Sequence, residues 1–508
     1  MPVLGIDLGT SNTCAAVVKG GAVQIILDET GHSTMPSVMS LNREGRFFVG
    51  HLAKAQMATQ PYLSVHSSKR LLGQKFSSDN VQKTLPYISY SVVADPDGMP
   101  LCEIGGQRIS PVEVSAAVLK KVKRMSEYAL GCEVKQAVIS VPAHFDNVQR
   151  TATKEAAELA GLEVLRLINE PTAAALAYGF GSEKNQRVAV YDFGGGTFDV
   201  SVLEISEGLF NVIGTGGDTF LGGNDFNQIL ADWLIKNFKS EHGIDLSLDQ
   251  MAMQRIVDAA EYAKIQLSQN EHTEIKLPRI SPNINENLGI SEVVYRSHFE
   301  NLCLPLVERS LRICERVLRD AGLRIKDLDE LIMVGGMTRM PLIREMVQKW
   351  LSKPLNTSMN PDEVVGIGAA IQAMSLATPQ SDLLLLDITP LTLGIEAANS
   401  VFVPLIPKNT KVPHRVHRHF TTNRDNQSSV VISVYQGEGK RCEENTFLGA
   451  FELSGIRPAP RMIPKIKVSF KIDVNGILEV SAIDEDSKES QSIEIVDMAK
   501  KALHSLNQ

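Results

Sequence analysis

A glycine-rich turn between two apolar strands, VYDFGGGTFDVSV at 190–202, constrains the fold more than any other stretch. The first apolar run ends at Asp192, and three glycines, Thr197 and Asp199 follow before a β-branched strand resumes. Glycines tolerate positive φ and a close approach of the backbone, so successive N–H groups can point at phosphate oxygens. The stretch therefore predicts a phosphate-binding loop.

A shorter copy of this pattern lies near the N-terminus, at residues 4–18. An apolar strand ends at Asp7, turns through Gly9 with the hydroxyl residues Thr10 and Ser11, and returns as a strand. One copy alone is weak evidence, because Asp-Gly turns are common. Two copies with the same order of chemistry predict two similar lobes that face one nucleotide. Each lobe would give an Asp to the metal and backbone donors to the phosphates.

The composition bounds the class of protein. A chain of 508 residues suggests about three domains. The net charge is −8 and the basic residues are scattered, which argues against a nucleic-acid partner. The six cysteines form no C-x-x-C pair, and the sequence has neither a secretory leader nor an apolar run of about eighteen residues. We therefore expect a cytoplasmic protein with no membrane contact.

Strands and helices alternate through most of the chain. Short strands are predicted in the first fifty residues and at 134–141, and helices are predicted over 110–131, 147–160, 254–269 and 302–320. The order of strand, turn and helix at 134–160 is typical of an α/β lobe.

Two segments rich in small residues are predicted to pack closely. One is the alanine-rich helix that begins at Glu170 and Pro171. The other is 360–371, where Asn360 is the expected N-cap and Pro361 the first helical residue. Small residues let helices approach each other, so this pair is a candidate hinge between the lobes.

Several polar positions have two interpretations. On pattern alone, Lys69 is best read as a solvated surface lysine, and a surface i,i+3 ion pair explains Glu261 and Lys264. Gly335 and Gly336 stand between an apolar run and a helix. They form either a plain strand–helix turn or a helix N-terminus that receives an adenosine or phosphate group.

The composition changes after Ala377. Residues 378–382 have the composition of a linker, but four leucines follow at 383–386. Burying one leucine fully is worth about 1.5–3 kcal/mol, so the run needs a surface to dock on. It is either an allosteric switch, docked in one state and free in another, or the first strand of the next domain.

The remainder of the chain has the pattern of an all-β domain. Apolar residues alternate over 465–474, and Asn475 with Gly476 is a strong hairpin signal, so we expect a compact sandwich. His414, His417 and His419 would permit a metal site. With no carboxylate or cysteine nearby in the sequence, a solvated basic edge strand explains these histidines better.

Five motifs in collinear order resemble the signatures of the seventy-kilodalton heat-shock protein family, and they look most like its bacterial DnaK-type members. They are IDLGTSNT at 6–13, INEPTAAA at 168–175, DFGGGTFD at 192–199, VGGMTR at 334–339 and the leucine run at 383–389. The resemblance covers about residues 3–496. It implies an α/β actin-like two-lobed ATPase domain at 1–377, an interdomain linker at 378–387, an all-β sandwich peptide-binding domain at 388–496 and a short C-terminal helix remnant at 497–508.

The resemblance also implies a nucleotide site with ATP or ADP and Mg²⁺ as cofactors, and K⁺ as a further candidate. Its catalytic residues would be Lys69, Glu170, Asp192, Thr197, Asp199 and Asp7, with Asp7 and Asp192 holding Mg²⁺ through water. The phosphates would contact Gly9, Thr10, Ser11, Asn12, Gly194, Gly195, Gly196 and Thr197. The rest of the nucleotide would lie against Glu261, Lys264, Ser268, Gly335, Gly336 and Arg339, with Asp362 at the hinge helix.

The activity implied is ATP hydrolysis that controls the binding of extended apolar segments of unfolded proteins, as in folding and the stress response. The implied partners are unfolded polypeptide, a J-domain co-chaperone at Arg166, Asn169 and Thr172, and a nucleotide-exchange factor. Pro142 and Arg150 match positions that relay the nucleotide state. The peptide would contact Ile395, Ala397, Ala398, Val401, Phe420, Asn423, Val430 and Ile432.

The sequence departs from the family pattern at three points, of which the altered arch and the missing lid favour an alternative and His144 bears on the relay through Pro142. Ala398 and Asn423 replace the Met and Ala that usually arch over the peptide, His144 replaces an aromatic residue, and the long helical lid is not found. A dedicated regulatory or scaffold ATPase switch that acts on one native partner is therefore the second hypothesis. A small-molecule kinase or filament of the same fold is the third, and the β-domain and leucine linker argue against it.

Overall fold

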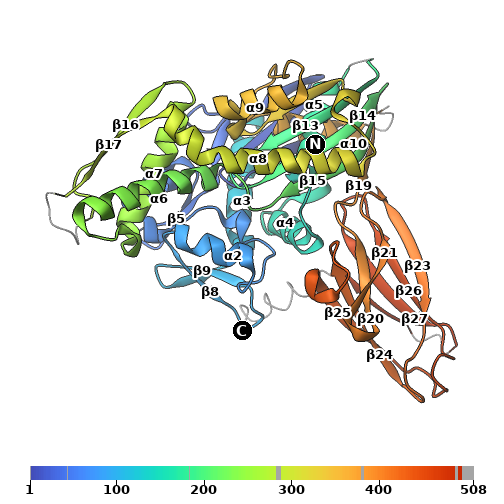
Figure 1. Ribbon diagram of the computed structural model, residues 1–508. Helices are drawn as coiled ribbons and strands as arrows, with labels where there is room; N and C mark the ends of the chain where they lie inside the picture. The colour runs from blue at the N-terminus through green and yellow to red at the C-terminus, as the bar shows by residue number, and fades with distance from the viewer. Residues whose placement is uncertain are drawn as a thin grey trace.

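The computed structural model describes residues 2–42, 44–181, 184–281, 288–378, 383–486 and 490–494. The predicted terminal helix at 497–508 and residues 379–382 of the predicted linker lie outside this part of the chain. Figure 1 shows a large α/β body and, beside it, a smaller unit built of strands that includes β20, β24 and β27. The α/β body contains two central sheets, described in turn below.

The first central sheet has the order β12-β11-β1-β2-β3, with β4 also paired to β2. β1 pairs antiparallel with β2 and parallel with β11, so the N-terminal hairpin lies at the centre of the sheet. Five of the six residues of β1 are buried, as expected of a strand covered on both faces. The strands are β1 Val3–Leu8, β2 Asn12–Lys19, β3 Ala22–Ile25, β4 Thr34–Pro36, β11 Gln136–Val141 and β12 Glu163–Asn169.

The second central sheet repeats this arrangement in the order β18-β13-β14-β15-β19-β22. β13 pairs antiparallel with β14 and parallel with β18, which is the pattern of β1 with β2 and β11. Each glycine-rich turn therefore joins two neighbouring antiparallel strands in the interior of its own sheet. The strands are β13 Gln186–Phe193, β14 Phe198–Ser206, β15 Leu209–Asp218, β18 Glu330–Val334, β19 Leu384–Ile388 and β22 Lys411–Val412.

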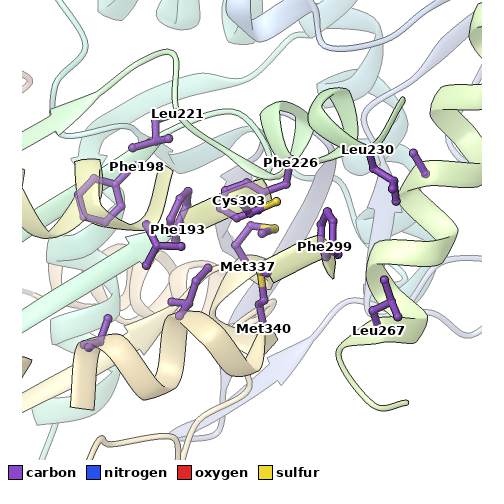
Figure 2. Close-up of a cluster of buried hydrophobic side chains, with 14 of the residues drawn as sticks. Phe193, Phe198, Leu221, Phe226, Leu230, Leu267, Phe299, Cys303, Met337 and Met340 are labelled. Atoms are coloured by element: carbon purple, nitrogen blue, oxygen red, sulfur yellow. The ribbon is translucent and has the colours of Figure 1, made fainter. Parts of the chain in front are cut away.

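Helices cover the sheets, and their packing forms the main cores. Figure 2 shows aromatic and sulfur-containing side chains gathered beneath the second sheet, among them Phe193, Phe198 and Met337. Burying one such side chain is worth about 1.5–3 kcal/mol, so this cluster anchors the glycine-rich turn between β13 and β14. The helices of eight or more residues are α3 Pro111–Leu130, α4 Asn147–Leu159, α5 Glu170–Gly179, α6 Gly223–His242, α7 Gln250–Leu267, α8 Arg296–Asp320, α9 Pro341–Leu351 and α10 Val364–Ala377.

The helix termini partly match the sequence prediction. α3 begins after Ser110, whose hydroxyl accepts from the N–H of Glu113 in a capping box, and it ends at Gly131. The predicted starts of three other helices are wrong. α7 starts four residues earlier than predicted because Asp249 caps it, and α8 starts six residues earlier. α10 starts at Val364 rather than at Pro361, because 361–363 form a turn in which Asn360 accepts from the N–H of Asp362.

The predicted close contact between the two helices rich in small residues is confirmed. A Cβ added at Gly368 of α10 would lie 1.7 Å from the carbonyl oxygen of Ala173 in α5. On another side of α10, a Cβ added at Gly5 of β1 would lie 2.0 Å from the backbone nitrogen of Ala370. The backbones therefore touch, and α10 is wedged between α5 and the first sheet.

Smaller elements complete the α/β body. α1 His51–Met57 and α2 Asp79–Thr84 accompany two small three-stranded sheets, and a two-stranded sheet follows α7. Their strands are β5 Met39–Leu41, β6 Phe47–Val49, β7 Ser64–Val65, β8 Ser91–Ala94, β9 Pro100–Ile104, β10 Gln107–Ile109, β16 His272–Leu277 and β17 Ile290–Tyr295.

The C-terminal unit consists of two four-stranded sheets, β21-β20-β24-β25 and β23-β26-β27-β28, that enclose one apolar core. The predicted hairpin at Asn475 and Gly476 joins β26 to β27. Of the predicted apolar face, Val474 lies outside the core and is 42% exposed. The strands are β20 Leu393–Ala397, β21 Val401–Ile406, β23 His414–Phe420, β24 Ser429–Gln436, β25 Thr446–Ser454, β26 Ile466–Ile472, β27 Leu478–Asp484 and β28 Ser490–Glu494.

The leucine run forms β19 and connects the two parts. β19 pairs parallel with β15 through residues 384–386 and antiparallel with β22 through 387–388. Leu385 is 6% exposed within an apolar cluster of the α/β body, whereas Leu384 is 55% exposed. The run is therefore docked on the second sheet, and it is also the strand that leads into the sandwich.

Candidate functional site

A cavity of about 330 Å³ lies between the two glycine-rich turns. Most of the predicted nucleotide residues line it: Asp7, Gly9, Thr10, Ser11, Asn12, Lys69, Glu170, Asp192, Gly194, Gly195, Gly196, Thr197, Glu261, Lys264, Gly335, Gly336, Arg339 and Asp362. The predicted residues Asp199 and Ser268 do not line it. Segments more than 300 residues apart in the chain thus meet around one space.

The two glycine-rich turns contact each other directly. A Cβ at Gly195 would lie 2.2 Å from Ser11 Oγ, and a Cβ at Gly196 would lie 2.6 Å from Thr10 Oγ1. A side chain at either position would force Ser11 or Thr10 of the opposing turn to move, so glycine is favoured at both positions independently of any ligand. The contact brings the backbone N–H groups of the two turns to the same end of the cavity, which is the arrangement that binds phosphate.

Lys69 is buried and paired, so its interpretation as a solvated surface lysine is wrong. Its Nζ donates to Glu170 Oε1 at 2.7 Å and to the carbonyl oxygen of Leu8 at 2.6 Å, and the residue is 6% exposed. Glu170 sits at the start of α5, where the helix dipole favours a carboxylate. The ammonium group is thus fixed at the wall of the cavity.

Three further carboxylates surround this pair. Burial, followed by the charge of Glu170, raises the pKa of Asp7 to about 7, although Ser140 donates to its Oδ1 at 2.7 Å. The same two causes raise the pKa of Asp199 to about 8. Burial and the neighbouring acids also raise the pKa of Asp192 well above its usual value.

The donor set fits a divalent cation with bound phosphate. Four carboxyl groups, three of them in buried residues, share one lysine, and their raised pKa values show that burying so much negative charge is unfavourable without a cation. Hard cations such as Mg²⁺ prefer oxygen ligands and retain waters. Asp7 and Asp192 end the central strands β1 and β13 on the cavity wall. These two residues would hold the ion, and the N–H groups of the turns would hold the phosphates.

The other end of the cavity shows different pairings from those predicted. Glu261 does not pair with Lys264 of its own helix: Lys54 Nζ of α1 donates to Glu261 Oε2 at 2.8 Å. Lys264 Nζ donates to the carbonyl oxygen of Gly223. The i,i+3 prediction is wrong because tertiary neighbours supply closer partners. Ser268 Oγ bonds within α7, to the carbonyl oxygen of Lys264, which explains its absence from the lining.

Sequence reasoning missed a second cross-link beside the phosphate end. Arg70 Nη2 donates to Asp225 Oδ2 at 2.6 Å and to the carbonyl oxygen of Gly196, and its guanidinium lies 4.4 Å from the ring centroid of Phe220. These partners are more than 120 residues away in the chain, and no local spacing signals them. The cavity is also lined by residues that were not predicted to contact a nucleotide, among them Thr34, Cys14, Met337, Pro361 and Val365.

The predicted peptide residues divide into two groups. Ile395 and Ile432 are buried in the sandwich core, and Phe420 and Val430 pack against it partly buried. Val401, Ala398 and Asn423 are exposed, and Ala397 is half-buried. The first group lies together on the inner side of the sandwich, whereas the expected arch residues face solvent.

A model of the family described as "Hsp70 protein" matches residues 3–507. The chain belongs to the Hsp70 family. Hsp70 proteins are ATP-dependent chaperones that bind ATP or ADP with Mg²⁺ and act on unfolded polypeptides together with co-chaperones. No helix in the described ranges is long and apolar enough to cross a membrane.

In this Hsp70 chain, the α/β body and the sandwich share a polar contact. Arg150 Nη2 donates to Asn169 Oδ1 at 2.7 Å, Arg150 Nη1 donates to the carbonyl oxygen of Asn475 at 3.3 Å, and Asn169 Nδ2 donates to Asp387 Oδ2 at 2.8 Å. Leu478 N–H donates to Asn147 Oδ1 at 2.7 Å. The contact therefore joins α4, β12, β19 and the β26–β27 hairpin.

Two of the three residues of the predicted co-chaperone surface are covered in this arrangement. Asn169 and Thr172 are buried, at 4% and 0% exposure, so an incoming protein cannot touch their side chains in this arrangement. Arg166 is half-buried. His144 is also enclosed: its N–H donates to Asp199 Oδ1, and burial, followed by the charge of Arg316, lowers its pKa to about 4.

Proposed function

We propose that the chain is an ATP-hydrolysing chaperone in which an actin-like, two-lobed ATPase domain at 1–377 controls the peptide affinity of the sandwich at 388–496. The observation that carries the proposal is the cavity between the paired turns, with buried carboxylates and one fixed ammonium group. The docked leucine strand β19 offers a route from this cavity to the sandwich.

Each group at the phosphate end has a task that its surroundings support. Bound Mg²⁺ would neutralise charge on the β- and γ-phosphates. Asp7 and Asp192 would hold the ion through its waters. Lys69, held by Glu170, would stabilise charge that develops on the transferred phosphoryl group and position the attacking water. Glu170 and Asp199 would orient that water, and the Thr197 hydroxyl would face the γ-phosphate.

The adenosine would occupy the end lined by Glu261, Lys264, Gly335, Gly336 and Arg339. Arg339 donates to Asp362 at 2.6 Å, so the hinge turn and the glycine pair are already tied together. Ser268 would act through Lys264 rather than by contact. K⁺ beside the phosphates, a DnaK-type client range, a J-domain co-chaperone, a nucleotide-exchange factor and a cytoplasmic location are further parts of the proposal.

The decisive experiment is the ATPase rate of the full chain, with and without a J-domain protein and an apolar peptide. We expect slow basal hydrolysis that rises when both are added. Hydrolysis that neither addition changes would contradict the coupling. Failure of calorimetry to detect ADP or ATP binding would contradict the nucleotide site itself.

A dedicated switch that acts on one native partner is the second candidate. It is favoured by Ala398 and Asn423, which leave the expected arch small and polar and are both exposed. Binding of many unrelated leucine-rich peptides at micromolar concentration would support the general chaperone. Binding of one folded partner, with no affinity for such peptides, would support the dedicated switch.

A further inference from the structure

One cluster of metal-ligating side chains lies outside the nucleotide cavity. Asp28, His32 and His51 offer one ligand atom each, and these atoms all lie within 4.8 Å of one another. Asp28 and His32 belong to the loop between β3 and β4, and His51 is the first residue of α1. The proposed nucleotide chemistry uses none of the three.

The carboxylate of Asp28 is a fixed and buried anchor. Its side chain is 3% exposed, and its Oδ1 accepts from the N–H of Thr30 at 2.8 Å, the N–H of His32 at 2.9 Å and the hydroxyl of Thr30 at 2.7 Å. These donors satisfy Oδ1 and set the orientation of the carboxylate. Oδ2 points to His51, whose Nε2 lies 3.0 Å away.

The two imidazoles converge on this anchor from the solvent side. His32 Nδ1 lies 3.8 Å from Asp28 Oδ1, and the two imidazole rings are 4.7 Å apart between centroids, tilted by 35°. Their side chains are 61% and 39% exposed. An ion could therefore reach the ring nitrogens without unfolding the loop, and a water could complete its coordination.

The separations suit a small divalent ion. With bonds of about 2.0–2.2 Å, the ligand atoms of a tetrahedral zinc site lie about 3.3–3.5 Å apart. His51 Nε2 lies 3.0 Å from Asp28 Oδ2 and His32 Nδ1 lies 3.8 Å from Asp28 Oδ1, so both separations are close to this value, although they end on the two different oxygens of the carboxylate. The exposed His32 side chain would have to turn toward Oδ2 for all three residues to bind one ion. Two imidazoles with one carboxylate suit Zn²⁺, Ni²⁺ or Cu²⁺ rather than Mg²⁺ or Ca²⁺.

Thr30 also prepares His32 for a metal. The Thr30 hydroxyl lies 2.7 Å from both His32 Nδ1 and Asp28 Oδ1, but it has a single proton. When the Thr30 hydroxyl donates this proton to Asp28 Oδ1, His32 Nδ1 has two possible states. It either carries a hydrogen that it donates to the Thr30 oxygen, or it carries none and has a free lone pair. A metal ion would accept this lone pair while the Thr30–Asp28 bond stays in place, which is the outer support that metal-bound carboxylates usually have.

The geometry points to a transition-metal site formed by Asp28, His32 and His51, of the Zn²⁺ class, with water as the fourth ligand. The site would tie the β3–β4 loop to the start of α1. His51 Nε2 also lies 3.3 Å from the carbonyl oxygen of Thr34, and Thr34 lines the nucleotide cavity. The transition-metal site would therefore lie beside the wall of the nucleotide cavity, separate from the magnesium position at Asp7 and Asp192.

Zinc titration of the nucleotide-free full chain against a chromophoric chelator, in excess Mg²⁺, tests the site. We expect a bound Zn²⁺ whose affinity falls by about 100-fold or more in Asp28→Asn, in His51→Gln and in the exposed-residue variant His32→Gln. Two control variants, His417→Gln with His419→Gln, and Cys132→Ser, should keep this ion. With Co²⁺ as the probe, the wild type should show a tetrahedral visible spectrum that His32→Gln loses.

Three results would overturn the proposal: no Zn²⁺ bound by the wild type, an affinity equal to that of the wild type in all three ligand variants, or loss of the ion in a control variant only. Far-ultraviolet circular dichroism identifies a variant that fails to fold. His32→Gln then decides the matter, because His32 is the most exposed of the three side chains. Nucleotide binding is measured separately, so failure of this site leaves the ATPase proposal standing.

Discussion

Lys69 shows how the meaning of a residue depends on distant partners. Its two hydrogen-bond acceptors, Leu8 and Glu170, are 61 and 101 residues away, and neither is visible in local spacing. The family resemblance assigned it a catalytic role, whereas composition and periodicity made it a surface residue. The partner of Glu261 could not be predicted from local spacing either, because Lys54 is 207 residues away.

Replacing Lys69 with Ala should lower the rate of ATP hydrolysis by about 100-fold or more while leaving ATP binding measurable. The ammonium group would stabilise charge that grows only in the transition state. Single-turnover hydrolysis and calorimetry measure the two quantities. Lys75→Ala is the control, since Lys75 donates to the carbonyl oxygen of Asp97 at the surface. Unchanged hydrolysis in Lys69→Ala would remove this residue from its role.

His66 should make the folded state sensitive to mild acid. Burial, followed by the charge of Lys54, lowers the pKa of His66 from 6.5 to about 4, so the folded protein holds it neutral. Its contribution to stability is complete above pH 6.5 and is lost as the pH falls toward 4. The wild type should lose at most about 1.4 kcal/mol per pH unit from this group. Thermal melts of His66→Phe between pH 7 and 5 should show a smaller loss; equal slopes would contradict the assignment.

At the scale of elements, sequence pattern and spacing predicted some features that depend on residues close together in the chain. The caps of α3 and the hairpin at Asn475 were predicted, because each depends on residues three or four apart. The starts of α7, α8 and α10 were not predicted. The α7 start and the turn at 361–363 also depend on local bonds, from Asp249 and Asn360, which helical spacing alone does not show. The sequence did not predict where β19 docks, because a run of leucines shows that the segment must be buried but not which surface buries it.

Leu385→Asp should uncouple peptide from ATPase activity by undocking β19. The residue lies in the apolar cluster of the second sheet, and a carboxylate there would lose its water. Leu384→Asp is the matched control, since that neighbouring leucine is 55% exposed. Stimulation of the ATPase by peptide should disappear in the first variant and persist in the second. Equal stimulation in both would refute the docked strand as the link.

Gly368→Ala should disrupt the contact between α5 and α10, although alanine is the better helix former. The added methyl would overlap the carbonyl oxygen of Ala173, which we expect to cost about 3 kcal/mol. Gly366→Ala, on the same helix, meets only Cys14 Sγ at 3.2 Å and should cost far less. Denaturant unfolding compares the two. Similar stabilities would show that the backbones can separate without penalty.

At the scale of the whole molecule, the repeated hairpin was the most informative signal. The paired turns predicted two similar lobes, and in each central sheet the first strand of the hairpin pairs antiparallel with the second and parallel with a strand from later in the chain. The sequence could not supply the cross-links that hold the cavity in one geometry. Arg70 with Asp225 and Lys54 with Glu261 connect segments that only the complete fold brings together.

Lys54→Met should speed nucleotide release by about two- to fivefold. The Lys54–Glu261 pair joins α1 to α7 across the cavity mouth, and partly exposed pairs are worth about 0.2–1 kcal/mol. Stopped-flow dissociation of a fluorescent ADP analogue measures the rate, and the gain should shrink in high salt. Lys239→Met, which breaks a comparable pair with Asp245, is the control. A release rate equal to that of the control would show that the pair does not restrain the nucleotide.

Strand β19 has neighbours on both edges, β15 on one and β22 on the other. Tension applied by a polypeptide held in the sandwich would therefore pass through β19, and would load the three pairs between residues 384–386 and 209–211 together with the buried side chain of Leu385. We expect three strand pairs to separate at a lower force than the one that unfolds a domain. The sandwich would then be released while still folded, and β19 would pair with β15 again once the tension was removed.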